Sequence, residues 1–74
     1  MKTGTVKIWQ KERGYGYITP DDGGDDVFVH FNGIDMEGFK SLNQGERVSY
    51  VLVAGYKTYQ AAQVHPILKK ASEV

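Results

Sequence analysis

The sequence predicts an all-β domain, and more specifically a five-stranded antiparallel Greek-key barrel. Several short segments alternate apolar and polar residues with a period of two, which is typical of half-buried strands. Segments rich in glycine and aspartate separate them, and none has a strong helical periodicity. The chain has 74 residues and no cysteine, so its core must be buried efficiently without disulfides, and a closed sheet does this.

Turn residues divide the chain into five expected strands. Pro20 ends the second strand, because proline has no N–H to donate to a neighbouring strand. Residues 21–25 follow as a hairpin turn, since glycine and aspartate tolerate the positive φ angles of such turns. A long connection over residues 32–45 has one possible helical turn, near residues 33–35. The expected strands are residues 3–10, 15–20, 26–31, 47–54 and 59–67.

The order of these strands points to one architecture. A meander of three strands, a long connection and a final pair match an OB-fold, and an SH3-like barrel is the nearest alternative. Residues 1–67 form the expected domain, and residues 68–74 form a short tail that we expect to fray. No apolar run reaches transmembrane length and no signal-peptide pattern is present, so we expect a cytoplasmic protein without membrane contacts.

Charge is balanced overall but unevenly distributed. Nine Lys and Arg residues offset nine Asp and Glu residues, so any affinity for nucleic acid must come from local charge. Positive charge gathers near the N-terminus and negative charge in the expected hairpin turn. The basic residues are Lys2, Lys7, Lys11 and Arg13, and the acidic residues are Asp21, Asp22, Asp25 and Asp26.

Aromatic side chains recur where a core does not need them. Successive side chains of a strand alternate faces, so Tyr15 and Tyr17 share one face of the second strand. Phe28 and His30 likewise share one face of the third. The opposite faces supply an aliphatic core, namely Ile18, Val27 and Val29. A face of rings suits stacked bases, and cations for phosphates stand at its edge, namely Lys7 and Arg13.

The first strand is expected to add another ring to this face. Strict alternation places Val6 and Ile8 toward the core, and Lys7 and Trp9 outward. The alternation therefore predicts an indole on the binding face.

Four blocks of the chain resemble the bacterial cold-shock protein family. They are GTVK at 4–7, RGYGYI at 13–18, DVFVHF at 26–31 and GFKSL at 38–42, and the resemblance extends over about residues 3–64. It implies a five-stranded OB barrel that binds single-stranded RNA and DNA with low sequence specificity. It further implies an RNA chaperone that keeps transcripts unpaired and affects transcription or translation. It implies no enzymatic activity and no cofactor, and we expect a monomer.

The resemblance also adds candidate binding residues. Alternation puts Phe31 on the core face, whereas the resemblance makes it a binding ring. Phe39 is either a lid on the barrel end or a wall of the groove, and the resemblance favours the groove. Lys57 is either a solvated charge or a contact to nucleic acid. The complete candidate set is Lys7, Trp9, Arg13, Tyr15, Tyr17, Phe28, His30, Phe31, Phe39 and Lys57.

The chain departs from the family pattern in its first strand. Where the family usually has Lys-Trp-Phe-Asn, this chain has KIWQ at 7–10, so Ile8 replaces a stacking ring. If the backbone follows the family path, Trp9 lies at the border between core and surface instead. The family's Phe-Gly-Phe is YGY at 15–17, which keeps both rings and adds hydroxyls. Tyr59 replaces a common proline, and is either a further ring or the start of the last strand.

Each feature has a simpler alternative. The rings could be a cross-strand cluster that only stabilises the sheet, or a patch that binds a protein partner. The acidic turn lacks the ligand spacing of a calcium loop, so we expect a solvated hairpin and no metal. As a hypothesis, its charge repels phosphate from that end of the barrel. Without a cysteine nucleophile, a histidine-rich metal set or a Walker loop, no enzyme is expected.

Overall fold

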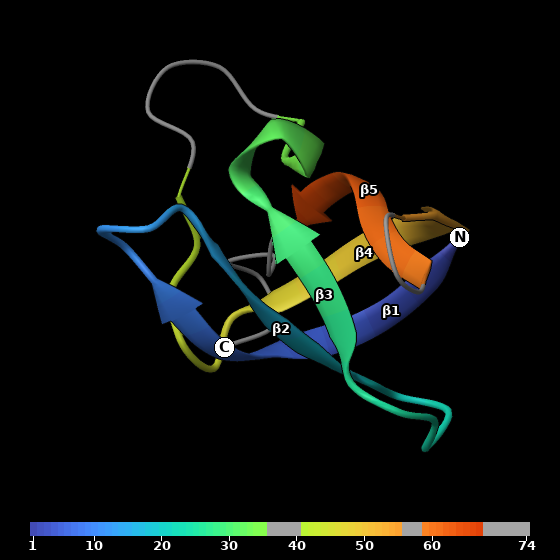
Figure 1. Ribbon diagram of the computed structural model, residues 1–74. Helices are drawn as coiled ribbons and strands as arrows, with labels where there is room; N and C mark the ends of the chain where they lie inside the picture. Colours follow the sequence, from blue (N-terminus) through green and yellow to red (C-terminus); the bar gives the residue numbers. More distant parts are fainter. Residues whose placement is uncertain (36–40, 56–58, 68–74) are drawn as a thin grey trace.

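Five strands close into a barrel in the computed structural model, which describes residues 1–35, 41–55 and 59–67 (Figure 1). The expected tail at 68–74 and the candidates Phe39 and Lys57 lie outside the described residues. The order around the barrel is β1-β2-β3-β5-β4. The elements are β1 (Lys2–Gln10), β2 (Tyr15–Pro20), β3 (Val27–His30), the 3₁₀ helix η1 (Phe31–Gly33), β4 (Arg47–Ala54) and β5 (Tyr59–Pro66).

The strand pairing is that of an OB-fold, as the sequence predicts. Four of the five interfaces are antiparallel, while β3 and β5 pair in parallel through Phe28 opposite Gln60 and Val29 opposite Ala61. β4 lies beside β1, and β5 runs in the same direction as β3. The parallel seam between β3 and β5 is therefore what closes the barrel.

The end of β3 differs from the prediction. The third strand stops at His30 and not at Phe31, because the chain turns there into η1. His30 Nδ1 accepts a hydrogen bond from the backbone N–H of Asn32 at 3.2 Å and so caps the short helix. The expected helical turn is present, two residues earlier than predicted. The remaining expected strand ends agree with the structure to within one residue. No helix among the described residues is long and apolar enough to cross a membrane.

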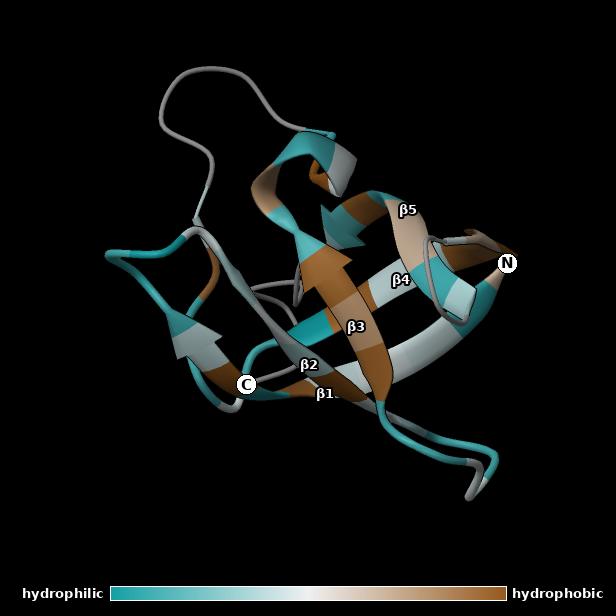
Figure 2. Ribbon diagram, in the orientation of Figure 1, coloured by the Kyte–Doolittle hydropathy of each residue, from teal (hydrophilic) through white to brown (hydrophobic). Residues whose placement is uncertain are grey.

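The core is aliphatic except for one tyrosine. Side chains from all five strands and from the connections meet inside the barrel, and Trp9 and Leu52 pack against them half-buried. In Figure 2 the hydrophobic colour of β3 contrasts with the hydrophilic turn that precedes it. The expected core residues Ile18, Val27 and Val29 are confirmed. The buried set is Val6, Ile18, Val27, Val29, Ile34, Leu42, Val48, Tyr50, Ala61 and Val64.

A bulge in β1 overturns the strict alternation expected for that strand. Val6 is opposite Ile18 and Ile8 is opposite Tyr17, so Lys7 is an extra residue without a counterpart on β2. An extra residue shifts every later side chain to the other face. Ile8 is consequently 41% exposed, whereas Trp9 is half-buried against the core. The prediction of an inward Ile8 and an outward Trp9 was wrong for this reason. The alternative from the family path, with Trp9 at the border between core and surface, is confirmed.

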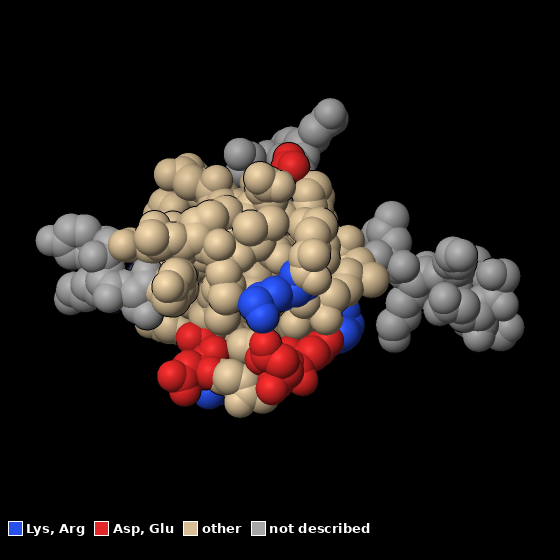
Figure 3. Space-filling model, turned by 90° about the vertical axis from the view of Figure 1, so that its right-hand side faces the viewer, with Lys and Arg blue, Asp and Glu red and all other residues tan. Residues whose placement is uncertain are grey.

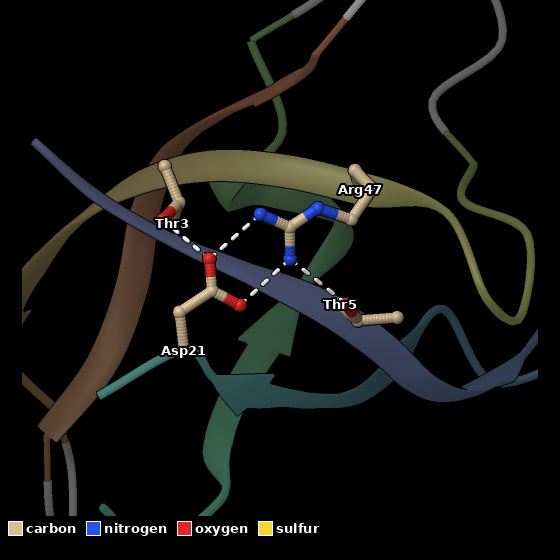
Figure 4. Close-up of polar contacts among 4 residues, drawn as sticks. All are labelled: Thr3, Thr5, Asp21 and Arg47. Carbon is tan, nitrogen blue, oxygen red and sulfur yellow. Dashed lines mark hydrogen bonds and ion pairs between the residues drawn. The ribbon is translucent and has the colours of Figure 1, made fainter. Parts of the chain in front are cut away.

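Ion pairs join the β2–β3 turn to the neighbouring strands. The Arg47 guanidinium binds both carboxylate oxygens of Asp21, at 2.7 and 2.6 Å (Figure 4). Thr3 Oγ1 also donates to Asp21 at 2.7 Å, and Arg47 donates to Thr5 Oγ1 at 3.0 Å. These contacts link β1, the turn and β4 at one end of the barrel.

We expect acid to weaken the fold through Asp21. The hydrogen bond from Arg47, followed by that from Thr3, lowers the pKa of Asp21 from 3.8 to about 2. The unfolded chain therefore binds more protons than the folded one between these values, so stability rises with pH in that window. The contribution of Asp21 is present above pH 3.8 and is lost as the pH falls toward about 2.

Thermal unfolding monitored by circular dichroism at several pH values tests this expectation. When the pH is lowered through this window, the melting temperature of the Asp21→Asn variant should fall by less than that of the wild type. Asp25→Asn is the matched control, because Asp25 forms no ion pair within the described part of the chain. Equal acid responses of the wild type and Asp21→Asn would contradict the assignment.

Candidate nucleic-acid interface

Three aromatic rings form a cluster on the outer face of β2 and β3. The register places Tyr15 opposite His30 and Tyr17 opposite Phe28. The centroid of the Phe28 ring lies 5.7 Å from that of Tyr15 and 5.8 Å from that of Tyr17. Tyr17 is 40% exposed, and Tyr15, Phe28 and His30 are half-buried. The sheet therefore holds the rings in fixed positions while leaving part of each ring open to solvent.

Phe31 and His30 extend the cluster at the end of β3. Their ring centroids are 4.5 Å apart, and Phe31 is 41% exposed because it follows the strand and does not continue its alternation. The Phe31 N–H donates to the Gly14 carbonyl at 2.8 Å. Gly14 has φ +75°, and a Cβ at this position would lie 2.9 Å from Phe31 Cδ1. A glycine at residue 14 thus allows both the turn and the close approach of the Phe31 ring.

Gly16 allows β1 to lie close behind the rings. A Cβ at this position would collide with the Ile8 carbonyl and would lie 3.0 Å from the Trp9 ring. Trp9 therefore packs where Gly16 has no side chain, on the core side of β2. Ile8 lies on the outer face opposite Tyr17, at the end of the ring cluster.

We refer to Ile8, Tyr15, Tyr17, Phe28, His30 and Phe31 as the platform. A groove of about 410 Å³ runs beside it along the seam between β3 and β5. Two amide side chains line this groove together with Phe28 and His30, and sequence reasoning missed both of them. They are Asn32, at the start of η1, and Gln60, which pairs with Phe28 across the parallel seam.

The candidate cations differ in their surroundings. Lys7 Nζ is 2.8 Å from Asp26 Oδ2, and this hydrogen bond raises the pKa of Lys7. Arg13 is exposed in the turn between β1 and β2 and has no acidic partner among residues 1–35, 41–55 and 59–67. Of these two cations, Arg13 is thus the one without an internal counter-charge.

The acidic turn is exposed, but three of its carboxylates are paired. Asp21 binds Arg47, Asp22 lies 3.0 Å from Lys2 Nζ, and Asp26 binds Lys7. Acidic side chains gather at one end of the face shown in Figure 3, with basic side chains next to them. Within the described residues, no group of three or more His, Cys, Asp or Glu could hold a metal ion.

Tyr59 is 65% exposed at the start of β5 and lines a cavity of about 210 Å³. Asp22, Asp25 and Asp26 line the same cavity. Tyr59 is the first residue of β5, and its ring lies beside the acidic turn. The Tyr50 hydroxyl is buried next to this cavity without a hydrogen-bond partner in the described part of the chain, and burial raises the pKa of Tyr50.

A barrel with this strand order and this row of rings can be compared with known families. Residues 2–67 match the sequence model of the "'Cold-shock' DNA-binding domain". The chain belongs to the cold-shock domain family. The resemblance inferred from the four sequence blocks is thereby confirmed, and the family as a whole binds nucleic acids and is not enzymatic.

Relatives of this cold-shock domain are found in several bacteria. The cold shock protein CspV of Vibrio cholerae is 52% identical over 62 residues, which cover 84% of this chain and 89% of the relative. The cold shock-like protein CspG of Shewanella violacea is 53% identical with the same coverage. The cold shock-like protein CspA of Bordetella pertussis is 50% identical over 64 residues, covering 86% of this chain and 96% of the relative.

The structure brings together most of the candidate binding residues of this cold-shock domain. Tyr15, Tyr17, Phe28, His30 and Phe31 share one surface, and Lys7 and Arg13 lie on β1 and on the turn after it. Trp9 lies behind this surface. Strict alternation did not predict the outward Ile8, whereas the family pattern, in which a stacking ring stands at this position, agrees with it.

Proposed function

We propose that this cold-shock domain binds single-stranded RNA and DNA with low sequence specificity. The observation that carries the proposal is the platform itself, with five rings on one outer surface while aliphatic side chains fill most of the core. Every base has a π-face, so stacking on such rings depends little on sequence. Arg13 and Lys7 supply contacts to phosphates, and Phe39 and Lys57 remain candidates for further contacts.

The energetics favour rings over charge as the main source of affinity. Stacking contributes about 1–3 kcal/mol per base, so four or five stacked bases support roughly micromolar binding after ordering costs. The formal net charge is zero, so the bulk field of the protein adds little. The amides of Asn32 and Gln60 can donate to and accept from base edges in the groove. They are the residues best suited to impose a modest base preference.

Single-strand binding gives an RNA-chaperone activity without ATP. The faces of paired bases are hidden inside a duplex, so the platform binds only the unpaired state. A protein that binds one of two states shifts the equilibrium toward it by mass action. We therefore propose that the protein keeps transcripts unpaired. We also propose that it acts as a monomer, because a closed barrel leaves no unpaired strand edge for a second copy.

The first test is a titration with short oligo-dT and oligo-U at two salt concentrations, with a duplex of equal length as control. Anisotropy of a labelled oligonucleotide reports binding. The fluorescence of Trp9, which lies behind the platform, reports whether binding changes the surroundings of its indole. We expect binding of single strands only, weakening with a log–log salt slope of about −0.7 per phosphate contact. No binding to either single strand would refute the proposal and favour a protein partner for the platform.

A hairpin RNA labelled at both ends tests the chaperone activity. We expect the protein to lower its melting temperature in a concentration-dependent way. An unchanged melting temperature at protein concentrations that saturate oligo-U would restrict the function to binding.

Ile8→Trp is expected to tighten binding. Ile8 is exposed opposite Tyr17 at the end of the platform, so an indole there offers one more stacking surface. A stacked base contributes about 1–3 kcal/mol, so affinity should rise by about fivefold or more. Ile8→Val is the matched control, with little expected change. Unchanged affinity of Ile8→Trp for oligo-dT would show that no base reaches this end of the platform.

A further inference from the structure

We propose that Asp26 competes with nucleic-acid phosphate for the ammonium group of Lys7, and so sets the affinity of the platform for single strands. The inference rests on the proposed function. It concerns a residue that lies beside the binding surface and that stacking alone would not involve.

Lys7 and Asp26 form an ion pair on the outer surface of the barrel. Lys7 lies exposed on the outer face of β1, at the bulge and directly before Ile8. Asp26 directly precedes β3, and its Oδ2 lies 2.8 Å from Lys7 Nζ. Thr19, on β2 between them, makes a long contact from its Oγ1 to Asp26 Oδ1 at 3.5 Å. The pair therefore spans the three strands that carry the platform, at the edge nearest the acidic turn.

Both members of the Lys7–Asp26 pair are accessible to solvent. The side chains of Lys7 and Asp26 are 60% and 35% exposed. An incoming phosphate can reach the ammonium group, but the group already donates to a carboxylate. Exposed ion pairs are weak, so a phosphate can displace Asp26. The displaced carboxylate then lies beside a polyanion and opposes its binding.

The surroundings of the other cations single out Lys7. Lys2 and Arg47 are also paired with acids of the turn, but they lie at the end of the barrel away from the rings. Arg13 has no acidic partner in the part of the chain that the structure describes. Among the Lys and Arg residues that the structure describes, Lys7 is the one that is both at the platform edge and paired with an acidic side chain.

Counterion release gives the competition a measurable signature. With Asp26 beside it, Lys7 belongs to a pair without net charge, so the pair does not neutralise a phosphate or release a counterion from the nucleic acid. Without the Asp26 charge, Lys7 neutralises one phosphate and releases its counterion. Asp26→Asn should therefore steepen the log–log salt slope by about 0.7, and should tighten binding at low salt by about two- to fivefold.

A double-mutant cycle tests the proposal. Affinities for oligo-dT are measured for the wild type, Asp26→Asn, Lys7→Gln and the double variant. We expect Lys7→Gln to reduce affinity more in the Asp26→Asn background than in the wild type, because only there is Lys7 free for phosphate. Asp25→Asn is the matched control, since it removes the same charge one residue away without releasing Lys7.

The outcomes separate the inference from the function on which it rests. Absence of oligo-dT binding by the wild type would refute both. Normal binding by the wild type with equal effects of Asp26→Asn and Asp25→Asn, or with no coupling to Lys7, would overturn the inference alone. Melting temperatures establish that each variant folds, and Asp26→Ser provides a second substitution if Asp26→Asn does not.

Discussion

Replacing Phe28 with alanine is expected to weaken binding to oligo-dT by at least about tenfold. Phe28 contacts the rings of Tyr15 and Tyr17 and lines the groove beside Gln60. Its removal deletes one stacking surface, which corresponds to about 1–3 kcal/mol, and releases two neighbouring rings from their positions. The measurement is an anisotropy titration well below the melting temperature, because the lost ring contacts also reduce stability by about 1 kcal/mol.

Two further variants test whether a loss of affinity in Phe28→Ala is specific to the platform rings. Tyr17→Ala removes a ring that is more exposed, so we expect more than about 1 kcal/mol of lost binding with less effect on stability. Tyr59→Ala removes a ring that lies beside the acidic turn and is not part of the ring cluster, and affinity should be nearly unchanged. If Tyr59→Ala weakened binding as much as Phe28→Ala did, the assignment of the binding surface to the platform would be wrong.

Gly16→Ala is expected to lower the free energy of unfolding by about 3 kcal/mol. A methyl group at this position meets the backbone of Ile8 and the ring of Trp9. The backbone of β1 cannot retreat without disturbing its pairing with β2, so the collision is not relieved by a side-chain rotation. Small domains are stable by only about 5–15 kcal/mol, so the variant should unfold at much lower urea concentration.

Gly24→Ala is the matched control for Gly16→Ala. A Cβ at Gly24 would meet only the end of the Asp22 side chain, at 3.3 Å, in the exposed turn. We expect a change in unfolding free energy within about 0.5 kcal/mol. Similar urea midpoints for Gly16→Ala and the wild type would mean that β1 does not approach β2 as closely as described.

Much of the fold follows from local patterns in the sequence. The second and fourth strands have the predicted bounds, because proline, glycine and charged residues delimit them clearly. The first strand was predicted nearly correctly in its bounds but not in its faces. A period-two pattern contains no signal for an extra residue, and the bulge at Lys7 is seen only in the pairing of β1 with β2.

In the candidate site, too, local sequence patterns predict some residues, while others depend on how distant strands pair. Tyr15, Tyr17, Phe28 and His30 could be placed on one surface, because they lie on strands joined by a short turn. Gln60 could not, since it reaches the surface through a parallel pairing of strands about 30 residues apart, and local alternation carries no information on that register. Their roles in binding remain predictions.

The parallel seam between β3 and β5 has a consequence for motion. It contains two residue pairs, compared with six between β1 and β2. Partial opening of the barrel, as amide hydrogen exchange would detect it, therefore requires the least disruption at this seam. Phe28 is one of its residues, so each opening event also detaches one edge of the platform. A single-stranded nucleic acid bound across Phe28 and Gln60 would contact both strands of the seam. It would therefore reduce the opening of the barrel and slow amide hydrogen exchange at the seam.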